Sequence, residues 1–151
     1  MNRIEYAELG DETAKPKRIQ LRRAKGWRLS TATTNPNGAV KVDRTTKYGN
    51  PFRVVDYEKH TGTVWPIPGV WWIVLDPTGR PVDRDAPPKT HREAVTQAVE
   101  LFEKALVAGE LKVTVEDVRY DLAGKDIGCW CALSDPCHGN PLLKIANEDP
   151  S

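Results

Sequence analysis

All three cysteines of this 151-residue chain fall within nine residues, and a histidine follows the last of them directly. The segment reads GCWCALSDPCHGNP, residues 128–141. Cysteines that serve as small core residues have no reason to gather in one segment. Cysteines that bind a metal ion or form a reactive centre do have a reason to gather, because that chemistry needs them at one point in space. The cluster consists of Cys129, Cys131, Cys137 and His138.

The residue types of this cluster leave three interpretations open. The first is a zinc ion, the candidate cofactor, because three cysteines and one histidine are a common zinc ligand set. The spacing C-x-C-x5-C-H, however, is not a usual zinc-finger spacing. The second is a reactive centre with Cys137 as the catalytic nucleophile and His138 as its base, since a helix N-terminus and an imidazole both lower a thiol pKa. The third is three buried cysteines that pack as small apolar side chains.

Positive charge is concentrated in one stretch of the chain. Residues 15–53 contain eleven lysines and arginines and a single acid, Asp43, although the net charge of the whole chain is only +1. Such a block favours a phosphate or polyanion ligand, unless the acidic remainder neutralises it. Arginine binds phosphate, an aromatic ring stacks on a base, and the backbone around Gly49 can cradle an anion. The candidate phosphate-binding residues are Arg22, Arg23, Lys25, Trp27, Arg28, Arg44, Lys47 and Asn50.

The elements that must position these residues indicate a small α/β (or α+β) domain. We expect a mixed sheet with a β-hairpin over residues 70–83 and two to three helices packed on it. The clearest helix spans 90–109, where Thr90 and Glu93 form a capping box, and a shorter one follows Thr114. A buried strand over 126–131 then precedes a last helix capped by Asn140. The cluster therefore lies where a strand ends and a helix begins, which is where α/β proteins tend to bind ligands. A further strand with Ile19 and Leu21 on one face, followed by a glycine turn, is expected within residues 18–30, and a short strand at 39–43 follows a loop over 31–38.

The length predicts one globular domain over residues 15–147, with flexible tails at 1–14 and 148–151. No apolar run approaches membrane-spanning length, so we expect no membrane partner. The first residues lack the apolar stretch of a secretory signal. An odd number of cysteines argues against a disulfide framework. These features together favour a cytoplasmic protein.

The chain resembles a family of small, mainly actinobacterial and bacteriophage proteins known as domain of unknown function 4326. The Cys-Trp-Cys with the later Cys-His is the most specific shared element, and Lys-Tyr-Gly-Asn-Pro-Phe at 47–52 is the next. The family often has Trp at the position of Tyr48 and an acid at that of Asn140. The resemblance implies a phage or prophage origin, and hence the host cytoplasm, but no activity. The matching stretches are RIQLRRAKGWRL (18–29), VKVDRTTKYGNPFRV (40–54), THREAVTQAVELF (90–102) and GKDIGCWCALSDPCHGNPLLKIAN (124–147).

The leading hypothesis is a protein that binds a nucleotide or nucleic acid through its basic N-terminal half, with the cysteine cluster as a metal or reactive centre. One alternative is an enzyme that acts on a nucleotide or a modified base with the cluster in its active site. Another is a phage protein that binds a host protein and uses the cluster only for its fold. The chain contains neither a Walker motif nor GxGxxG, so no particular nucleotide is indicated.

Overall fold

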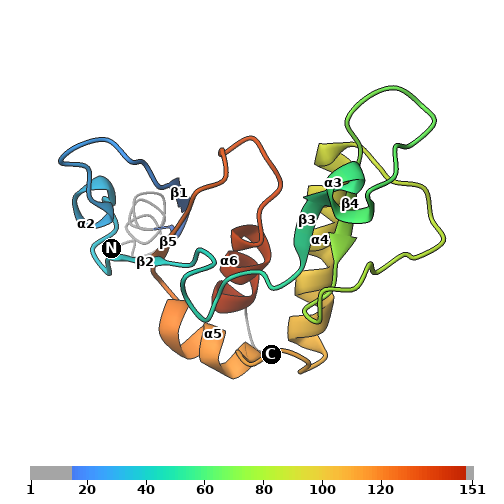
Figure 1. The fold of residues 1–151 in the computed structure, drawn as a ribbon. Coiled ribbons are helices and arrows are strands. Elements are labelled where there is room, and N and C mark those ends of the chain that lie inside the picture. The colour runs from blue at the N-terminus through green and yellow to red at the C-terminus, as the bar shows by residue number, and fades with distance from the viewer. Residues whose placement is uncertain (1–14, 149–151) are drawn as a thin grey trace, which may run out of the picture.

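The computed structural model describes residues 15–148, which form two small sheets and five helices (Figure 1). The tail expected at 1–14, and all but the first residue of the tail expected at 148–151, lie outside the described residues. The mixed α/β class is confirmed. The elements are β1 (Arg18–Gln20), α2 (Leu29–Ala32), β2 (Ala39–Lys41), β3 (Arg53–Asp56), α3 (Tyr57–Thr61), β4 (Trp72–Leu75), α4 (His91–Val107), α5 (Val115–Leu122), β5 (Asp126–Cys129) and α6 (Gly139–Asn147).

The sheet that carries the cysteine segment is parallel, with strand order β1-β5-β2. The central strand β5 is buried along its whole length, as expected for a strand paired on both sides. Asp126 at its amino end is 1% exposed and accepts hydrogen bonds from the Lys17 amide at 2.9 Å and the Thr33 hydroxyl at 2.7 Å. This carboxylate ties the amino end of β5 to the segments beside β1 and β2, so the three strands run in register toward one carboxyl edge.

The second sheet pairs β4 with β3, antiparallel, with Asp56 opposite Trp72 and Arg53 opposite Leu75. A strand over 70–75 was expected, but its partner was expected in the return arm of the hairpin, at 80–83. That arm makes only an isolated bridge between Leu75 and Pro81. The Asp76 amide donates to the Arg80 carbonyl at 2.7 Å and the Val82 amide to the Val74 carbonyl at 3.0 Å, and these two bonds make up the bridge.

The helices begin close to the predicted caps. Thr90 forms the capping box with Glu93, and Thr114 forms another with Asp117. The last helix begins two residues earlier than predicted: His138 occupies the N-cap position, and Asn140 lies inside the first turn. Asn140 is not a cap because its side-chain oxygen accepts a hydrogen bond from Arg18 Nε at 3.2 Å instead. One helical turn, α2, also stands where part of a loop was expected.

The core joins both sheets through α4, α5 and α6. In Figure 1, α6 lies between the parallel sheet with α5 and the antiparallel sheet with α4. The largest fully buried side chains include Phe102, Leu106, Leu122, Ile127 and Leu142, and all belong to one cluster. Helix α6 and the cysteine loop before it therefore rest on a continuous apolar base. Across residues 15–148, the helices are too short or too polar to cross a lipid bilayer.

Gly49 closes the turn between β2 and β3, and we predict that Gly49→Ala destabilises the fold. A Cβ at this position would lie 2.5 Å from the Arg44 Cα and 2.8 Å from the Asp43 carbonyl oxygen, so the backbone must move. We expect a loss of about 3 kcal/mol in the free energy of unfolding, the upper end of ordinary overpacking. Gly79→Ala is the matched control, because a Cβ there meets no atom within 4 Å. Its positive φ predicts a cost of only about 1 kcal/mol. Urea denaturation that gives equal losses for both variants would contradict this account of the turn.

Candidate functional site

The parallel sheet brings three separate segments of the chain to one edge. Beyond the strands, the Leu21 amide donates to the Cys129 carbonyl at 2.8 Å and the Val42 amide donates to the Gly128 carbonyl at 2.9 Å. Residues 21–23, 42–44 and 129–131 are therefore neighbours at the carboxyl ends of β1, β2 and β5. Ligands of open parallel sheets bind at this edge.

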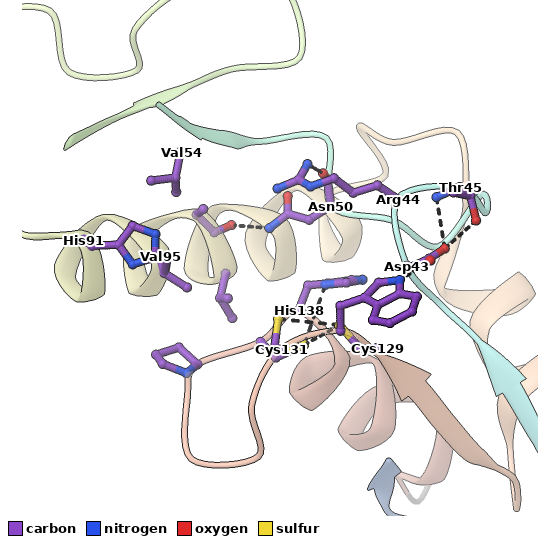
Figure 2. Close-up of a pocket in the computed structure, with 15 residues that line it drawn as sticks. Asp43, Arg44, Thr45, Asn50, Val54, His91, Val95, Cys129, Cys131 and His138 are labelled. Atoms are coloured by element: carbon purple, nitrogen blue, oxygen red, sulfur yellow. Dashed lines mark hydrogen bonds between the residues drawn. The ribbon is translucent and has the colours of Figure 1, made fainter. Parts of the chain in front are cut away.

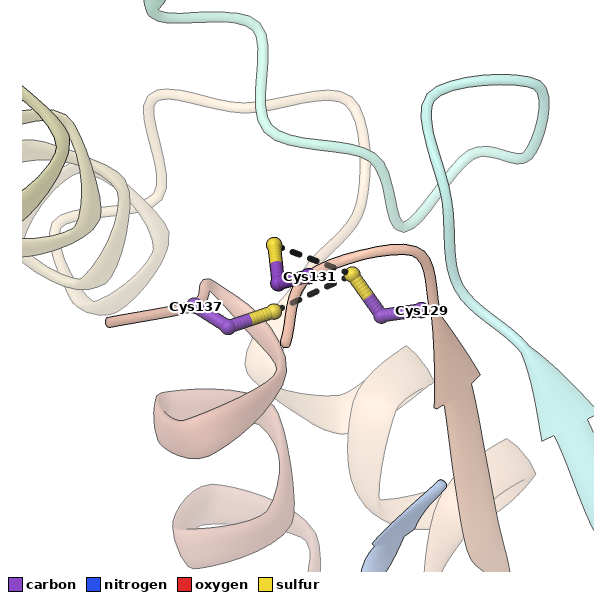
Figure 3. A group of neighbouring side chains, drawn as sticks. All are labelled: Cys129, Cys131 and Cys137. Carbon is purple, nitrogen blue, oxygen red and sulfur yellow. Dashed lines mark hydrogen bonds between the residues drawn. The ribbon is translucent and has the colours of Figure 1, made fainter. Parts of the chain in front are cut away.

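The three cysteine sulfurs lie together at this edge (Figure 3). Cys129 ends β5, Cys131 follows a bend, and Cys137 directly precedes the first turn of α6. The Cys129 sulfur is 3.6 Å from that of Cys131 and 3.1 Å from that of Cys137, and all three lie within 4.8 Å of one another. A disulfide would need roughly 2.05 Å. Tetrahedral zinc with bonds of about 2.3 Å places its sulfurs roughly 3.8 Å apart. The sequence predicted that these cysteines and His138 would share one small sphere; the structure gathers the three cysteines, and this group could hold a metal ion.

His138 lies beside the sulfurs with a fixed orientation. Its Nε2 is 2.7 Å from the Val42 carbonyl oxygen, which can only accept, so Nε2 carries the hydrogen and donates. Its Nδ1 is consequently unprotonated and lies 3.9 Å from the Cys137 sulfur. The imidazole is outside the group of atoms that all lie within 4.8 Å of one another, so a small shift would be needed to complete a four-ligand set. Metal-binding histidines commonly donate their other N–H to a backbone carbonyl, as His138 does.

The protonation states in the cluster follow from its packing. Contacts with the Cys131 and Cys137 thiols lower the pKa of Cys129, and contact with Cys129 raises the pKa of both partners. Burial lowers the pKa of His138 and keeps the ring neutral. Cys129 is thus the most acidic thiol of the three. Cys137, the nucleophile suggested by the sequence, is 1% exposed, and contact with Cys129 raises its pKa. Metal binding requires all three cysteines as thiolates beside a neutral imidazole, so a bound metal ion would displace the protons of Cys131 and Cys137.

A pocket of about 460 Å³ opens beside the cluster. Figure 2 shows Arg44 and Asn50 on one side of it and Cys129, Cys131 and His138 on the other. One wall is apolar and comes mainly from α4. The lining residues are Asp43, Arg44, Thr45, Asn50, Val54, His91, Val95, Ala98, Val99, Cys129, Trp130, Cys131, Pro136, Cys137 and His138.

Arg44 is the cation of this pocket. Its guanidinium donates to the backbone carbonyls of Asn50 and, at 3.2 Å, Phe52. Partial burial lowers its pKa, but an arginine remains positive. Within residues 15–148 it forms no ion pair with an acid. Its charge faces the cysteine cluster, since interaction with Cys131 and Cys129 raises its pKa against the effect of burial. Asn50 acts differently: its amide donates to the Ala98 carbonyl at 3.0 Å, its oxygen accepts from the Phe52 amide at 2.9 Å, and both bonds anchor the turn.

The other predicted phosphate-binding residues lie outside this pocket. Lys47 pairs with Asp121 at 3.2 Å and lines a different hollow. Arg23 is exposed, and its guanidinium carbon lies 4.6 Å from the centre of the Trp130 ring. Trp27 is half-buried, whereas Arg22, Lys25 and Arg28 are exposed. The structure thus brings Arg44 and Asn50 to the cysteines, but not Lys47 or residues 22–28.

Arg18 is the main site residue that the sequence did not reveal. It is 9% exposed, and its guanidinium donates to four carbonyls of the cysteine loop instead of to a carboxylate. In the sequence it is one of eleven basic residues, and nothing distinguishes it from the exposed ones. Arg18 differs from them by its place in β1, where pairing with β5 brings its side chain to the cysteine loop. The sequence does not reveal this pairing. The carbonyls belong to Cys131 (3.1 Å), Ala132 (3.1 Å), Leu133 (3.0 Å) and Asp135 (3.2 Å).

We predict that Arg18→Lys loosens the cysteine loop. A lysine keeps the charge but has one nitrogen, so it cannot reach the same spread of carbonyls. We expect the free energy of unfolding to fall by about 2–4 kcal/mol and the cysteines to react faster with a thiol reagent. Arg28→Lys is the control, because Arg28 is exposed and its side chain makes no hydrogen bond within residues 15–148. Unchanged melting and thiol labelling in Arg18→Lys would show that the loop does not depend on this residue.

Comparison with other proteins gives a family and no characterised relative. Neither the curated proteins nor the solved structures include a match to this chain. The sequence profile described as domain of unknown function DUF4326 matches residues 19–148, which span both sheets, the pocket and the cysteine cluster. The chain belongs to the DUF4326 family.

Proposed function

We propose that this protein binds a nucleotide in the pocket beside a zinc centre formed by its cysteine cluster. One observation carries the proposal: Arg44, a cation without an acidic partner within residues 15–148, lines the same pocket as the three cysteines and His138. The sequence suggested the cysteine cluster and the phosphate-binding arginine as separate features. Their meeting in one pocket supports a single function for them.

Zinc is the metal that fits the donor set. Thiolates and imidazole favour zinc over magnesium or calcium, which prefer oxygen ligands. The Cys129 sulfur lies 3.6 Å from the Cys131 sulfur and 3.1 Å from the Cys137 sulfur, close to the separation in a zinc tetrahedron. His138 supplies the fourth ligand through Nδ1, while its Nε2–H on the Val42 carbonyl holds the ring. The Gly139 amide also donates to the Cys137 sulfur at 3.4 Å, which stabilises a thiolate there.

A nucleotide matches the remaining surface of the pocket. Guanidinium groups bind phosphate through charge-assisted hydrogen bonds, so Arg44 is the phosphate ligand. The apolar wall from Val95, Ala98 and Val99 suits the flat face of a base. A volume of about 460 Å³ lies within the range of small-molecule sites. The basic stretch of residues 15–53 would attract such an anion to this side of the protein.

The same pocket supports a second candidate, an enzyme that acts on the bound nucleotide. The observation that favours it is Cys129, which lines the pocket and whose pKa is lowered by its neighbouring thiols. A thiolate at a pocket wall is a potential nucleophile when no metal occupies it. Activity that survives a chelator and is lost on alkylation of the cysteines would favour the enzyme over the zinc-stabilised binding protein.

The test is nucleotide binding by wild-type protein and by Arg44→Gln. The probes are the common nucleoside monophosphates, with the matching nucleosides and inorganic phosphate alongside, in titration calorimetry. We expect at least one nucleotide to bind wild type and to bind Arg44→Gln roughly 10- to 100-fold more weakly, because a charged hydrogen bond to phosphate is lost.

Lys47→Gln is the matched control for this test, since Lys47 lies in the same basic stretch but pairs with Asp121 outside the pocket. It should bind like wild type. The proposal fails if wild type binds none of the nucleotides, or if Arg44→Gln binds them as tightly as Lys47→Gln does.

A further inference from the structure

Trp130 is a large aromatic side chain held rigidly at the surface. It lies between two cysteines of the cluster in the sequence, yet it is 39% exposed. Its indole N–H donates to Asp43 Oδ2 at 2.8 Å. Asp43 is 5% exposed and is itself fixed by the Thr45 amide at 3.0 Å and by the Thr45 hydroxyl. An apolar ring that merely lacked space inside would not be tied to a buried carboxylate, so the fold fixes this ring in its exposed position.

The Trp130 ring also lies between Arg44 in the pocket and the exposed cations of residues 22–28. On one side it lines the pocket that contains Arg44. Arg23 lies over the ring, with its guanidinium carbon 4.6 Å from the ring centre. Arg23 belongs to residues 22–28, whose cations are exposed and form no ion pair with an acid of residues 15–148. The other cations of the stretch are Arg22, Lys25 and Arg28.

We propose that Trp130 and Arg23 form a stacking site for an unpaired base of single-stranded nucleic acid. The phosphates of that strand run along residues 22–28, and the neighbouring nucleotide occupies the pocket at Arg44. This inference rests on the proposed function, because it takes the pocket ligand to be one nucleotide of a chain. An exposed ring beside a positive groove is the usual way to bind single strands without sequence preference.

The position of the surface cations favours a strand over a free nucleotide. The cations of residues 22–28 lie outside the pocket, so a mononucleotide held by Arg44 would leave them without a ligand. A polymer supplies several phosphates at regular spacing, so it can contact both Arg44 and the cations of residues 22–28. Double-stranded nucleic acid fits less well, because its bases are stacked on each other and present no free face to Trp130.

The experiment measures binding of a fluorescein-labelled ten-nucleotide oligothymidylate by fluorescence anisotropy at several salt concentrations. Wild type should bind it more tightly than the same strand paired with its complement. Trp130→Leu should weaken binding about 10-fold or more, and Trp130→Phe should restore most of it, because a phenyl ring still stacks. Arg23→Gln should weaken binding and reduce the slope of log affinity against log salt by about one, since one phosphate contact is lost.

Arg84→Gln is the charge-matched control: Arg84 is exposed and lies outside both the pocket and residues 22–28. It should bind the oligonucleotide like wild type. Equal binding by Trp130→Leu, Arg23→Gln and wild type would overturn the stacking site. If Trp130→Leu melts at a lower temperature than wild type, its weaker binding could come from lost stability. The binding of Trp130→Phe and Arg23→Gln then decides whether the stacking site exists.

Failure of this inference is distinguishable from failure of the proposed function. If wild type binds a nucleoside monophosphate through Arg44 but not the oligonucleotide, the stacking site is wrong and the nucleotide pocket stands. If it binds neither, both are wrong. Arg23→Gln should leave mononucleotide affinity unchanged, because Arg23 does not line the pocket.

Discussion

The parallel pairing of β5 between β1 and β2 is the constraint on which the site depends. Parallel strands end at a common edge, so residues far apart in the sequence arrive there together. The end of β5 supplies the first cysteine, the end of β2 leads to Arg44, and the end of β1 leads to Arg23. Buried Asp126 fixes the opposite end of β5, so the register of the strands is determined at both ends.

The cysteine loop is tied to both outer strands of this sheet. Arg18 from β1 donates to four of its carbonyls, and His138 donates to the carbonyl of Val42 next to β2. The loop therefore reaches its observed conformation only when the sheet has formed. A metal bound by that loop in the folded state alone would add its binding free energy to folding. The same loop displays Trp130, so any movement of the metal ligands would also move the proposed stacking surface.

Much of this arrangement is predictable from the sequence because the signals are local. Capping residues locate α4 and α5, and the spacing of Cys129 and Cys131 followed by a short loop predicts the gathering of the sulfurs. The rest depends on long-range contacts. Arg18 and Lys47 look alike as members of a basic stretch, but tertiary pairing directs one to the cysteine loop and the other to Asp121. Strand β3 was missed because the turn signal at residues 76–79 pointed to the arm at 80–83, and not to residues 53–56, as the partner of β4.

The central claim is that the sheet edge carries a zinc centre made by its three cysteines and His138. X-ray absorption at the zinc edge tests it most directly, on full-length protein loaded with one equivalent of zinc and freed of excess metal. The account predicts three sulfur neighbours at about 2.3 Å and one nitrogen at roughly 2.0–2.1 Å. A nitrogen that disappears in His138→Ala would identify the fourth ligand. A zinc shell of oxygen and nitrogen alone, or protein that retains no zinc, would contradict the account.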